Sequence, residues 1–151
     1  MKKSIKLTLL LIGVLFSGNS FAQLNISKTK ASEEIVRVKF FGVTRIVLDR
    51  SVIESDTLYN IRYVNNAFKS KIDFKSFSIV ASTEEMLLIK DIFLKAIEGE
   101  YEGENLALTF GDKKYLISKG SGGLWLYHSE YDYAIFSKKE VIKLFEPFNA
   151  K

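Results

Sequence analysis

Two serine–glutamate pairs constrain the fold of this chain more than any other feature. Ser82 is followed three residues later by Glu85, and Ser137 is followed by Glu140. This spacing is the capping box that starts a helix. Each pair directly follows residues that alternate between apolar and polar, as they do in a strand with one buried face. The sequence therefore predicts two strand-to-helix junctions, 55 residues apart.

Runs of alternating residues stand before each junction and predict strands. They cover residues 36–41, 44–49, 59–63 and 72–79 in the first half, and residues 106–110, 114–118, 124–128 and 131–136 in the second. One run is irregular, because its apolar residues change parity between Phe74 and Phe77. A bulge at Lys75–Ser76 would keep all of them on one face of a sheet.

The residues after each serine have the spacing of a helix with an apolar face. After Ser82 this spacing extends to Ile97, and Gly99 stands where a C-cap glycine belongs. The segment after Ser137 is shorter, and Pro147 ends it. The predicted fold is α+β, with antiparallel strands in one sheet or two and two helices, in the order ββββα-ββββα. We expect a single domain over residues 35–148, and the repeated junction suggests an internal duplication.

This order of elements is similar to that of the Whirly proteins, which bind single-stranded DNA. The similarity rests on the two strand-to-helix junctions and covers element order only, since no Whirly sequence motif carries over. It implies single-stranded nucleic-acid binding as an alternative function for this chain.

The first 22 residues have the pattern of a secretory signal peptide. A basic start over residues 2–6 precedes an apolar run over residues 7–16, and small residues stand at Ser20 and Ala22. A membrane span needs about 20 apolar residues, which is twice the length of this run. We predict cleavage after Ala22, a flexible lead over residues 23–34, and a protein that is periplasmic or secreted in a Gram-negative bacterium.

Composition excludes several kinds of chemistry. The chain has no cysteine, so it has no disulfide, thiol nucleophile or cysteine–metal site. Its only histidine is His128, and one histidine without cysteine cannot hold zinc. The carboxylates of Glu100, Glu102 and Glu104 could share one side of an extended segment and hold Ca²⁺, although solvated glutamates have the same pattern. We predict no metal, no cofactor and no catalytic set.

Several basic residues accompany tyrosines on the strands of the first half. They include Arg37, Lys39, Arg45, Tyr59 and Arg62. Nucleobases stack on aromatic side chains above a basic sheet, so these residues are the candidate nucleic-acid site of the alternative function. A solvated sheet face whose tyrosines point into the core has the same pattern.

The stretch GSGGLWLYHSEYDYAIF, over residues 120–136, holds the only tryptophan of the chain. Its glycines are typical of a tight turn between strands. A two- or four-residue turn after His128 would place Leu124, Leu126, Tyr133 and Ile135 on a core face. The other face would then carry Trp125, Tyr127, Asp132, Ala134 and Phe136. We therefore predict Trp125, Tyr127 and His128 as residues that contact a partner, although packing between the two halves would also account for the aromatic pair.

The sequence thus favours an exported, non-enzymatic binding module that acts on a protein partner in the bacterial envelope. An inhibitor or immunity-type role would fit its size and predicted location.

Overall fold

The computed structural model describes residues 31–104 and 106–149. The predicted signal peptide and most of the predicted lead lie outside these residues. The elements are β1 (Glu33–Phe40), β2 (Val43–Ile53), β3 (Asp56–Val64), β4 (Phe74–Val80), α2 (Thr83–Glu98), β5 (Leu106–Phe110), β6 (Lys113–Gly120), β7 (Gly123–Ser129), β8 (Asp132–Phe136), α3 (Lys138–Leu144) and a 3-10 turn, η1 (Glu146–Phe148). The α+β class and the order ββββα-ββββα are confirmed.

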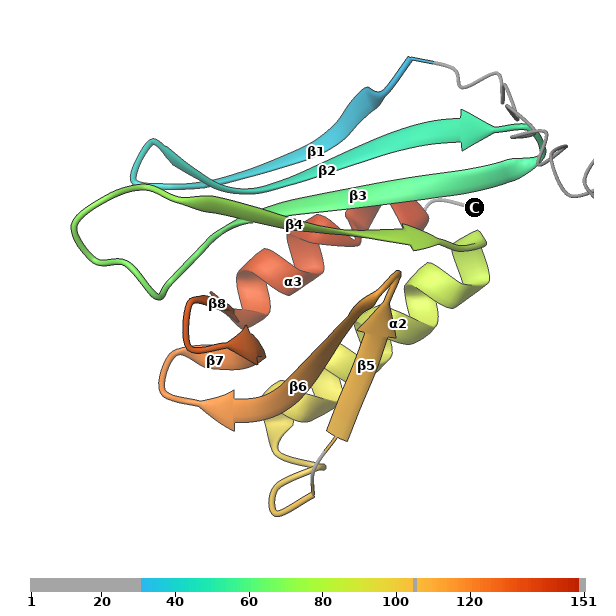
Figure 1. Cartoon of the computed structure of the whole chain (residues 1–151). Coiled ribbons are helices and arrows are strands. Elements are labelled where there is room, and N and C mark those ends of the chain that lie inside the picture. The colour runs from blue at the N-terminus through green and yellow to red at the C-terminus, as the bar shows by residue number, and fades with distance from the viewer. Residues whose placement is uncertain (1–30, 105, 150–151) are drawn as a thin grey trace, which may run out of the picture.

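The strands form two separate sheets, which answers a question that the sequence left open. Sheet A has the order β1-β2-β3-β4 and sheet B the order β5-β6-β7-β8, and every pairing is antiparallel. Figure 1 shows sheet A above sheet B, with both helices between them. Each half is therefore a simple meander, and its neighbouring strands are joined by short turns except for the longer β3–β4 loop over residues 65–73.

Both predicted capping boxes are present. The Ser82 hydroxyl accepts a hydrogen bond from the Glu85 backbone, and the Glu85 carboxylate accepts one from the Ser82 backbone. Ser137 and Glu140 make the same exchange at the start of α3. Gly99 ends α2 in the left-handed conformation, with φ of 93°. These caps satisfy the backbone donors that a helix start leaves unpaired.

Each helix covers the sheet of the other half. Helix α2 follows sheet A in the chain but packs on β6 and β7 of sheet B, whereas α3 follows sheet B and packs on β1 and β2 of sheet A. The helices also contact one another, and one continuous core joins both sheets and both helices. Neither half therefore closes a core with its own helix.

The start of β1 differs from the prediction. The strand begins at Glu33, so Glu33 and Glu34 belong to sheet A rather than to a flexible lead. A bulge at Ile35 lets the pairing with β2 continue past the expected end. The ion pair between Glu33 and Arg50, at 2.8 Å, lies across this extension.

The predicted bulge at Lys75–Ser76 is wrong. Strand β4 pairs with β3 in a continuous register from Phe74 to Val80. Phe77 therefore enters the core, whereas Phe74 and Ile72 remain exposed. The change of parity in the sequence marks the end of a loop and the start of a strand.

Among the described residues, no helix is long and apolar enough to cross a bilayer.

Candidate functional site

The β7–β8 hairpin contains a bulge that the sequence did not reveal. Pairing is regular from Leu124 to Tyr127, and it then shifts by one residue at His128 before Ser129 pairs with Asp132. The extra residue reverses the parity expected for β8. Ala134 and Phe136 consequently join Leu124 and Leu126 in the core. Tyr133 and Ile135, which were expected in the core, lie beside Trp125 and Tyr127 on the opposite face.

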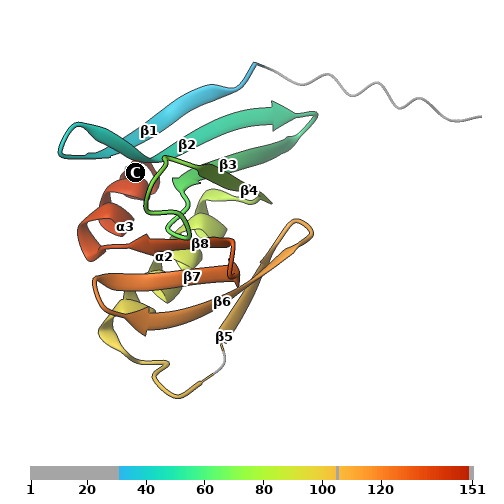
Figure 2. The same ribbon diagram turned by 60° about the vertical axis from the view of Figure 1, so that its left-hand side comes forward.

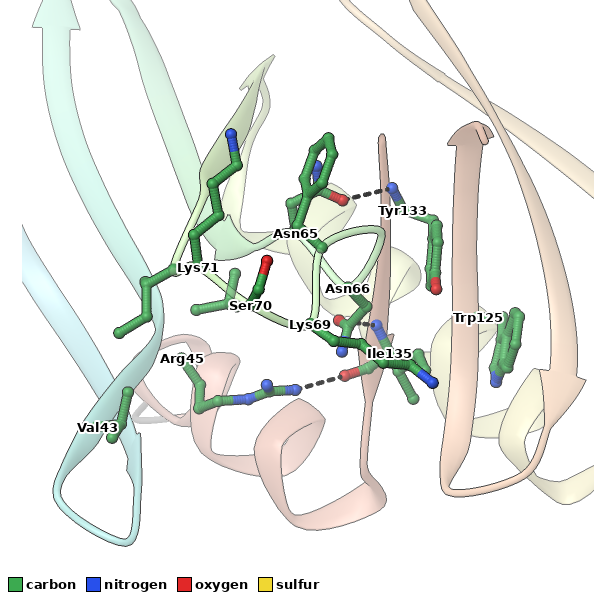
Figure 3. Close-up of a pocket in the computed structure, with 13 residues that line it drawn as sticks. Val43, Arg45, Asn65, Asn66, Lys69, Ser70, Lys71, Trp125, Tyr133 and Ile135 are labelled. Atoms are coloured by element: carbon green, nitrogen blue, oxygen red, sulfur yellow. Dashed lines mark hydrogen bonds between the residues drawn. The ribbon is translucent and has the colours of Figure 1, made fainter. Parts of the chain in front are cut away.

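The bulge brings three aromatic rings into one row. The rings of Trp125 and Tyr133 are stacked 5.6 Å apart between centroids, at an interplanar angle of 9°. The rings of Tyr127 and Tyr133 are stacked 6.2 Å apart at 29°. Figure 3 shows the Trp125 and Tyr133 rings standing side by side on their strands. We call these three residues the aromatic row.

Gly120 lies against the other side of the indole. A Cβ atom at Gly120 would lie 2.2–2.8 Å from three atoms of the five-membered ring of Trp125. The indole N–H also approaches the backbone oxygen of Ser121, at 3.4 Å. Because Gly120 belongs to β6 and Tyr133 to β8, which flank β7 on opposite sides, the two faces of the indole are covered. The glycine turn is thus shaped around Trp125, and Gly123, with φ of 140°, has no room for a Cβ beside the Phe136 carbonyl.

The outer face of sheet B carries apolar side chains, and no helix or strand of residues 31–104 and 106–149 packs over them. The aromatic row is continued there by Ile135 and by Leu116, which pairs directly with Tyr127. Leu116 is 46% exposed and Tyr127 is 37% exposed. A hollow of about 310 Å³ opens beside them, lined in part by Leu116, Trp125 and Tyr127. We call the set of Leu116, Ile135 and the aromatic row the sheet B face.

Asn65 and Asn66 join the two sheets. The Asn65 side chain donates to the Tyr131 carbonyl at 2.7 Å and accepts from the Tyr133 backbone at 3.2 Å. The Asn66 backbone donates to the Tyr133 carbonyl at 2.9 Å, and its side chain accepts from the Ile135 backbone at 3.1 Å. Figure 3 shows this pair of asparagines against β8. The β8 edge of sheet B is therefore occupied by the β3–β4 loop.

A second polar joint lies inside the core. The Tyr63 hydroxyl donates to the buried carboxylate of Asp132, and it lies 3.3 Å from the Tyr115 hydroxyl. The Lys113 ammonium lies 3.6 Å from the same carboxylate. Burial, and then the bond to Asp132, raises the pKa of Tyr63 well above its usual range. Burial raises the pKa of Tyr115 to about 12. Both hydroxyls are therefore neutral near pH 7.

A cleft of about 600 Å³ separates sheet A from the aromatic row. Val43, Arg45 and the loop residues 65–66 and 68–72 line one side, and Trp125, Tyr133 and Ile135 line the other. Among its lining residues there is no carboxylate, while Arg45, Lys69 and Lys71 are cationic. The cleft is therefore positively charged where it meets the sheet B face.

A bulge directs Arg45 into this cleft. Val38 pairs with Ile46 and Lys39 with Thr44, so Arg45 is the extra residue of β2. Its guanidinium donates to the Ile135 carbonyl at 3.4 Å and lies 3.5 Å from the Glu140 carboxylate. Arg45 thus ties β2 to β8 and to the cap of α3.

Three of the remaining candidates for nucleic-acid binding, Arg37, Tyr59 and Arg62, do not share a surface with Arg45. Tyr59 is buried, with its ring against Phe148 at a centroid distance of 5.2 Å, so it cannot stack on a base. Arg37 binds the Glu34 carboxylate, and Arg62 binds Asp49 at 3.0 Å. Lys39 is exposed near the end of β1. The five candidates therefore divide among the core, the cleft and the ion-paired outer face of sheet A.

His128 does not join Trp125 and Tyr127. As the bulge residue it turns away from the aromatic row, and its ring lies 5.2 Å from the Tyr115 ring. Its Nδ1 atom is 2.9 Å from the Lys114 carbonyl. The structure thus brings together two of the three predicted partner contacts, Trp125 and Tyr127.

The acidic segment after α2 does not form a cage. Glu100, Glu102 and Glu104 are all exposed, and Glu100 lies 4.0 Å from the Lys95 ammonium. Within the part of the chain that the structure describes, no group of three or more His, Asp or Glu side chains could hold a metal ion.

Sequence reasoning missed three residues of the site, Tyr133, Ile135 and Leu116. Their alternation was visible, but the bulge that places Tyr133 and Ile135 beside Trp125 left no local signal. The comparisons with known proteins found no matching family model, no matching curated protein and no matching solved structure, so the similarity to the Whirly proteins remains one of element order.

Proposed function

We propose that this chain is an exported binding module that holds a protein partner in the bacterial envelope against its sheet B face. The observation that carries the proposal is the row of Trp125, Tyr133 and Tyr127, which continues into exposed Leu116 on a face that no helix or strand of the described residues covers. Aromatic side chains are enriched at the centres of protein interfaces. Burial of an apolar sheet face of this kind by a second protein lowers the free energy of the complex, because apolar surface is removed from water.

The rigidity of the row also supports binding. Trp125 is held between Gly120 and Tyr133, so little side-chain entropy remains to be lost when a partner arrives. Preorganised side chains of this type increase affinity because they lower the cost of ordering the interface. The charge of the neighbouring cleft, through Lys69 and Lys71, would favour a partner that carries carboxylates near its apolar contact.

The same geometry disfavours the nucleic-acid alternative. Stacking on a base requires an aromatic face that is open, and both faces of the Trp125 indole are covered. Tyr59 is inside the core. A nucleic acid would therefore have to displace Tyr133 or the glycine turn before it could stack on Trp125.

A capture experiment tests the proposal. Tagged wild-type protein and the double variant Leu116→Ser, Tyr127→Ser would be incubated with envelope extract, and the captured proteins identified by mass spectrometry. Leu88→Ser is the matched control, since Leu88 lies on α2 and is 59% exposed. We expect a defined protein that binds the wild type and the Leu88→Ser variant and is lost from the double variant.

Two outcomes contradict the proposal. One is capture that is the same for the wild type and the double variant. The other is enrichment of an oligonucleotide or glycan in place of a protein. The mass of the purified chain in solution, compared between the wild type and the double variant, shows whether the partner is a second copy of the same chain.

A further inference from the structure

Two loops at one end of sheet A carry exposed apolar side chains. The β1–β2 turn and the β3–β4 loop lie next to one another at this end, on the left in Figure 1, and Val43 and Ile72 from the two loops line the same cleft. We call residues 39–45 and 66–75 together the loop end. Its exposed apolar residues are Phe40, Phe41, Val43, Ile72 and Phe74.

The backbone conformation of the β1–β2 turn does not account for the presence of a phenylalanine at position 41. Phe40 pairs with Val43, so Phe41 and Gly42 form a two-residue turn, with φ of 47° and 81°. Asn or Gly is favoured at such positions, and a bulky side chain there is strained. Phe41 is nevertheless 91% exposed, and its ring contacts only the neighbouring Phe40 ring in the aromatic pairs of the described residues. A strained, protruding ring that adds nothing to the core points to a role in binding.

The second loop adds further apolar surface beside this turn. Ile72 is 64% exposed, and Phe74 is exposed at the start of β4. The Lys71 ammonium lies 4.6 Å from the centre of the Phe68 ring, so the lysine stem and the ring lie together. Apolar tips with lysines among them are typical of a surface that enters the interface of a bilayer while its charges remain at the headgroups.

The loop end carries a net positive charge. Its five cations are Lys39, Arg45, Lys69, Lys71 and Lys75, of which Arg45 is paired with Glu140, and Asp73 is its only acidic residue. Asp73 accepts a hydrogen bond from the Asn65 amide at 2.9 Å and lies 3.9 Å from the Lys75 ammonium. The net charge therefore faces outward as positive, which complements an anionic surface.

The opposite end of the same sheet provides a contrast. The β2–β3 turn there is also a two-residue turn, between Ile53 and Asp56, and Glu54 again has a positive φ, of 57°. This turn exposes Glu54, Ser55 and Asp56. The two ends of sheet A, which have turns of similar geometry, thus differ in their side chains. The β2–β3 turn is acidic and polar, whereas the loop end is basic and apolar.

We propose that the loop end docks the protein on an anionic phospholipid surface, with Phe41, Phe40 and Ile72 in the bilayer interface and the lysines at the headgroups. A lipid surface fits better than a protein groove, because these side chains stand on protruding tips and need no preformed pocket to receive them. The loop end and the sheet B face meet at the cleft, but Leu116 and Tyr127 do not line it, so substitutions at these two residues test partner binding separately from docking.

Cosedimentation with lipid vesicles tests this proposal. The probes are vesicles of phosphatidylglycerol mixed equally with phosphatidylcholine, and vesicles of phosphatidylcholine alone. The protein is the exported chain purified from the envelope, with its N-terminus read by mass spectrometry. We expect binding to the anionic vesicles that weakens as salt is raised, and much weaker binding to the neutral ones.

Two variants of the loop end sharpen the test. Phe41→Asn suits the left-handed turn and preserves the fold, and it should weaken vesicle binding about tenfold, as expected for the loss of one buried phenyl ring. The pair Lys69→Gln, Lys71→Gln should weaken it about tenfold or more. The matched controls are Val80→Asn, at the other end of β4, and the pair Lys114→Gln, Lys143→Gln. These controls should bind like the wild type.

Three results overturn the proposal. The first is an absence of wild-type binding to anionic vesicles, and the second is equal binding to neutral ones. The third is an equal loss of binding in the control pair Lys114→Gln, Lys143→Gln, which would mean that overall charge alone holds the protein to lipid. If vesicle binding is absent and Phe41→Asn instead abolishes capture of a protein partner, the loop end belongs to the partner's site. Loss of partner capture by Leu116→Ser, Tyr127→Ser with unchanged vesicle binding would keep the two proposals separate.

Discussion

The outer faces of the two sheets differ, although the sheets have the same strand order and lead into the same type of helix cap. On sheet A, Val47 lies between Arg37 and Arg62 and is only 3% exposed. Both arginines are held by carboxylates of their own sheet. On sheet B the corresponding face carries Trp125 and Tyr127, whose rings stack with Tyr133.

This difference follows from the separate roles of the inner and outer faces of the sheets. The inner faces of both sheets are shared, since each receives the helix of the other half. Their composition is therefore fixed by the common core. The outer faces do not contribute to this core, so one can be an ion-paired surface and the other an apolar surface. Substitutions on the two faces should accordingly differ in whether they affect stability or binding.

The largest expected effect comes from breaking the joint between the sheets. Asn65→Ala removes the amide that satisfies the Tyr131 carbonyl and the Tyr133 backbone donor in the interior. We expect the free energy of unfolding to fall by about 3 kcal/mol, because buried polar groups lose their partners. Urea titration followed by circular dichroism measures this. Asn60→Ala, which removes only a bond to Ser78, is the control and should cost less than about 1 kcal/mol. Equal effects of the two substitutions would show that Asn65 is not a joint.

A smaller effect should follow from Gly120→Ala, which disturbs sheet B alone. The new methyl group occupies space that the indole holds, so Trp125 must shift and its stacking with Tyr133 should weaken. We expect a loss of about 2 kcal/mol, as for other overpacked sites, and a change in tryptophan fluorescence. Adding Trp125→Phe should recover part of this loss. Unchanged fluorescence in Gly120→Ala would contradict the packing described for this turn.

Alkaline pH should destabilise the contact between the two sheets, without any substitution. The pKa of Tyr115 is about 12 in the folded protein and that of Tyr63 is also raised, whereas tyrosine in an unfolded chain ionises near about 10. The stabilisation that the neutral Tyr63 and Tyr115 hydroxyls provide is therefore fully present below about pH 10. It is lost as pH rises toward the pKa values of these groups in the folded protein. Urea midpoints at rising pH, with tyrosinate absorbance, measure this. In Tyr115→Phe the fall in stability should be less steep, and an unchanged slope would remove Tyr115 as its cause.

The smallest effects should be on the outer faces. Arg62→Met breaks the partly buried ion pair with Asp49 and should lower stability by about 1 kcal/mol. Leu116→Ser should change stability by less still, because its side chain is half exposed, while it impairs partner binding. The comparison between the faces fails if Leu116→Ser destabilises the fold more than Arg62→Met does.

Local patterns predicted the fold well because they have local causes. A capping box needs only four residues, so Ser82 and Ser137 located both helices, and alternation located the eight strands. The errors arose from longer-range causes. The bulge at His128 reversed the parity of β8, and the cost of one extra residue depends on pairing with a neighbouring strand. Asn65 and Asn66 have the composition of a turn, and nothing near them indicates that they bind β8, some 66 residues later.

Because each helix packs on the sheet of the other half, the order of synthesis determines when each sheet can be covered. Sheet A is synthesised first, yet the helix that covers it is α3, which is nearly the last segment to be made. The first half would therefore keep an unshielded apolar face until the end of translation. Such a chain is slow to become compact during synthesis, because its closing contacts are among the most distant in the sequence. The core of the molecule is therefore complete only once α3 has been added to the chain.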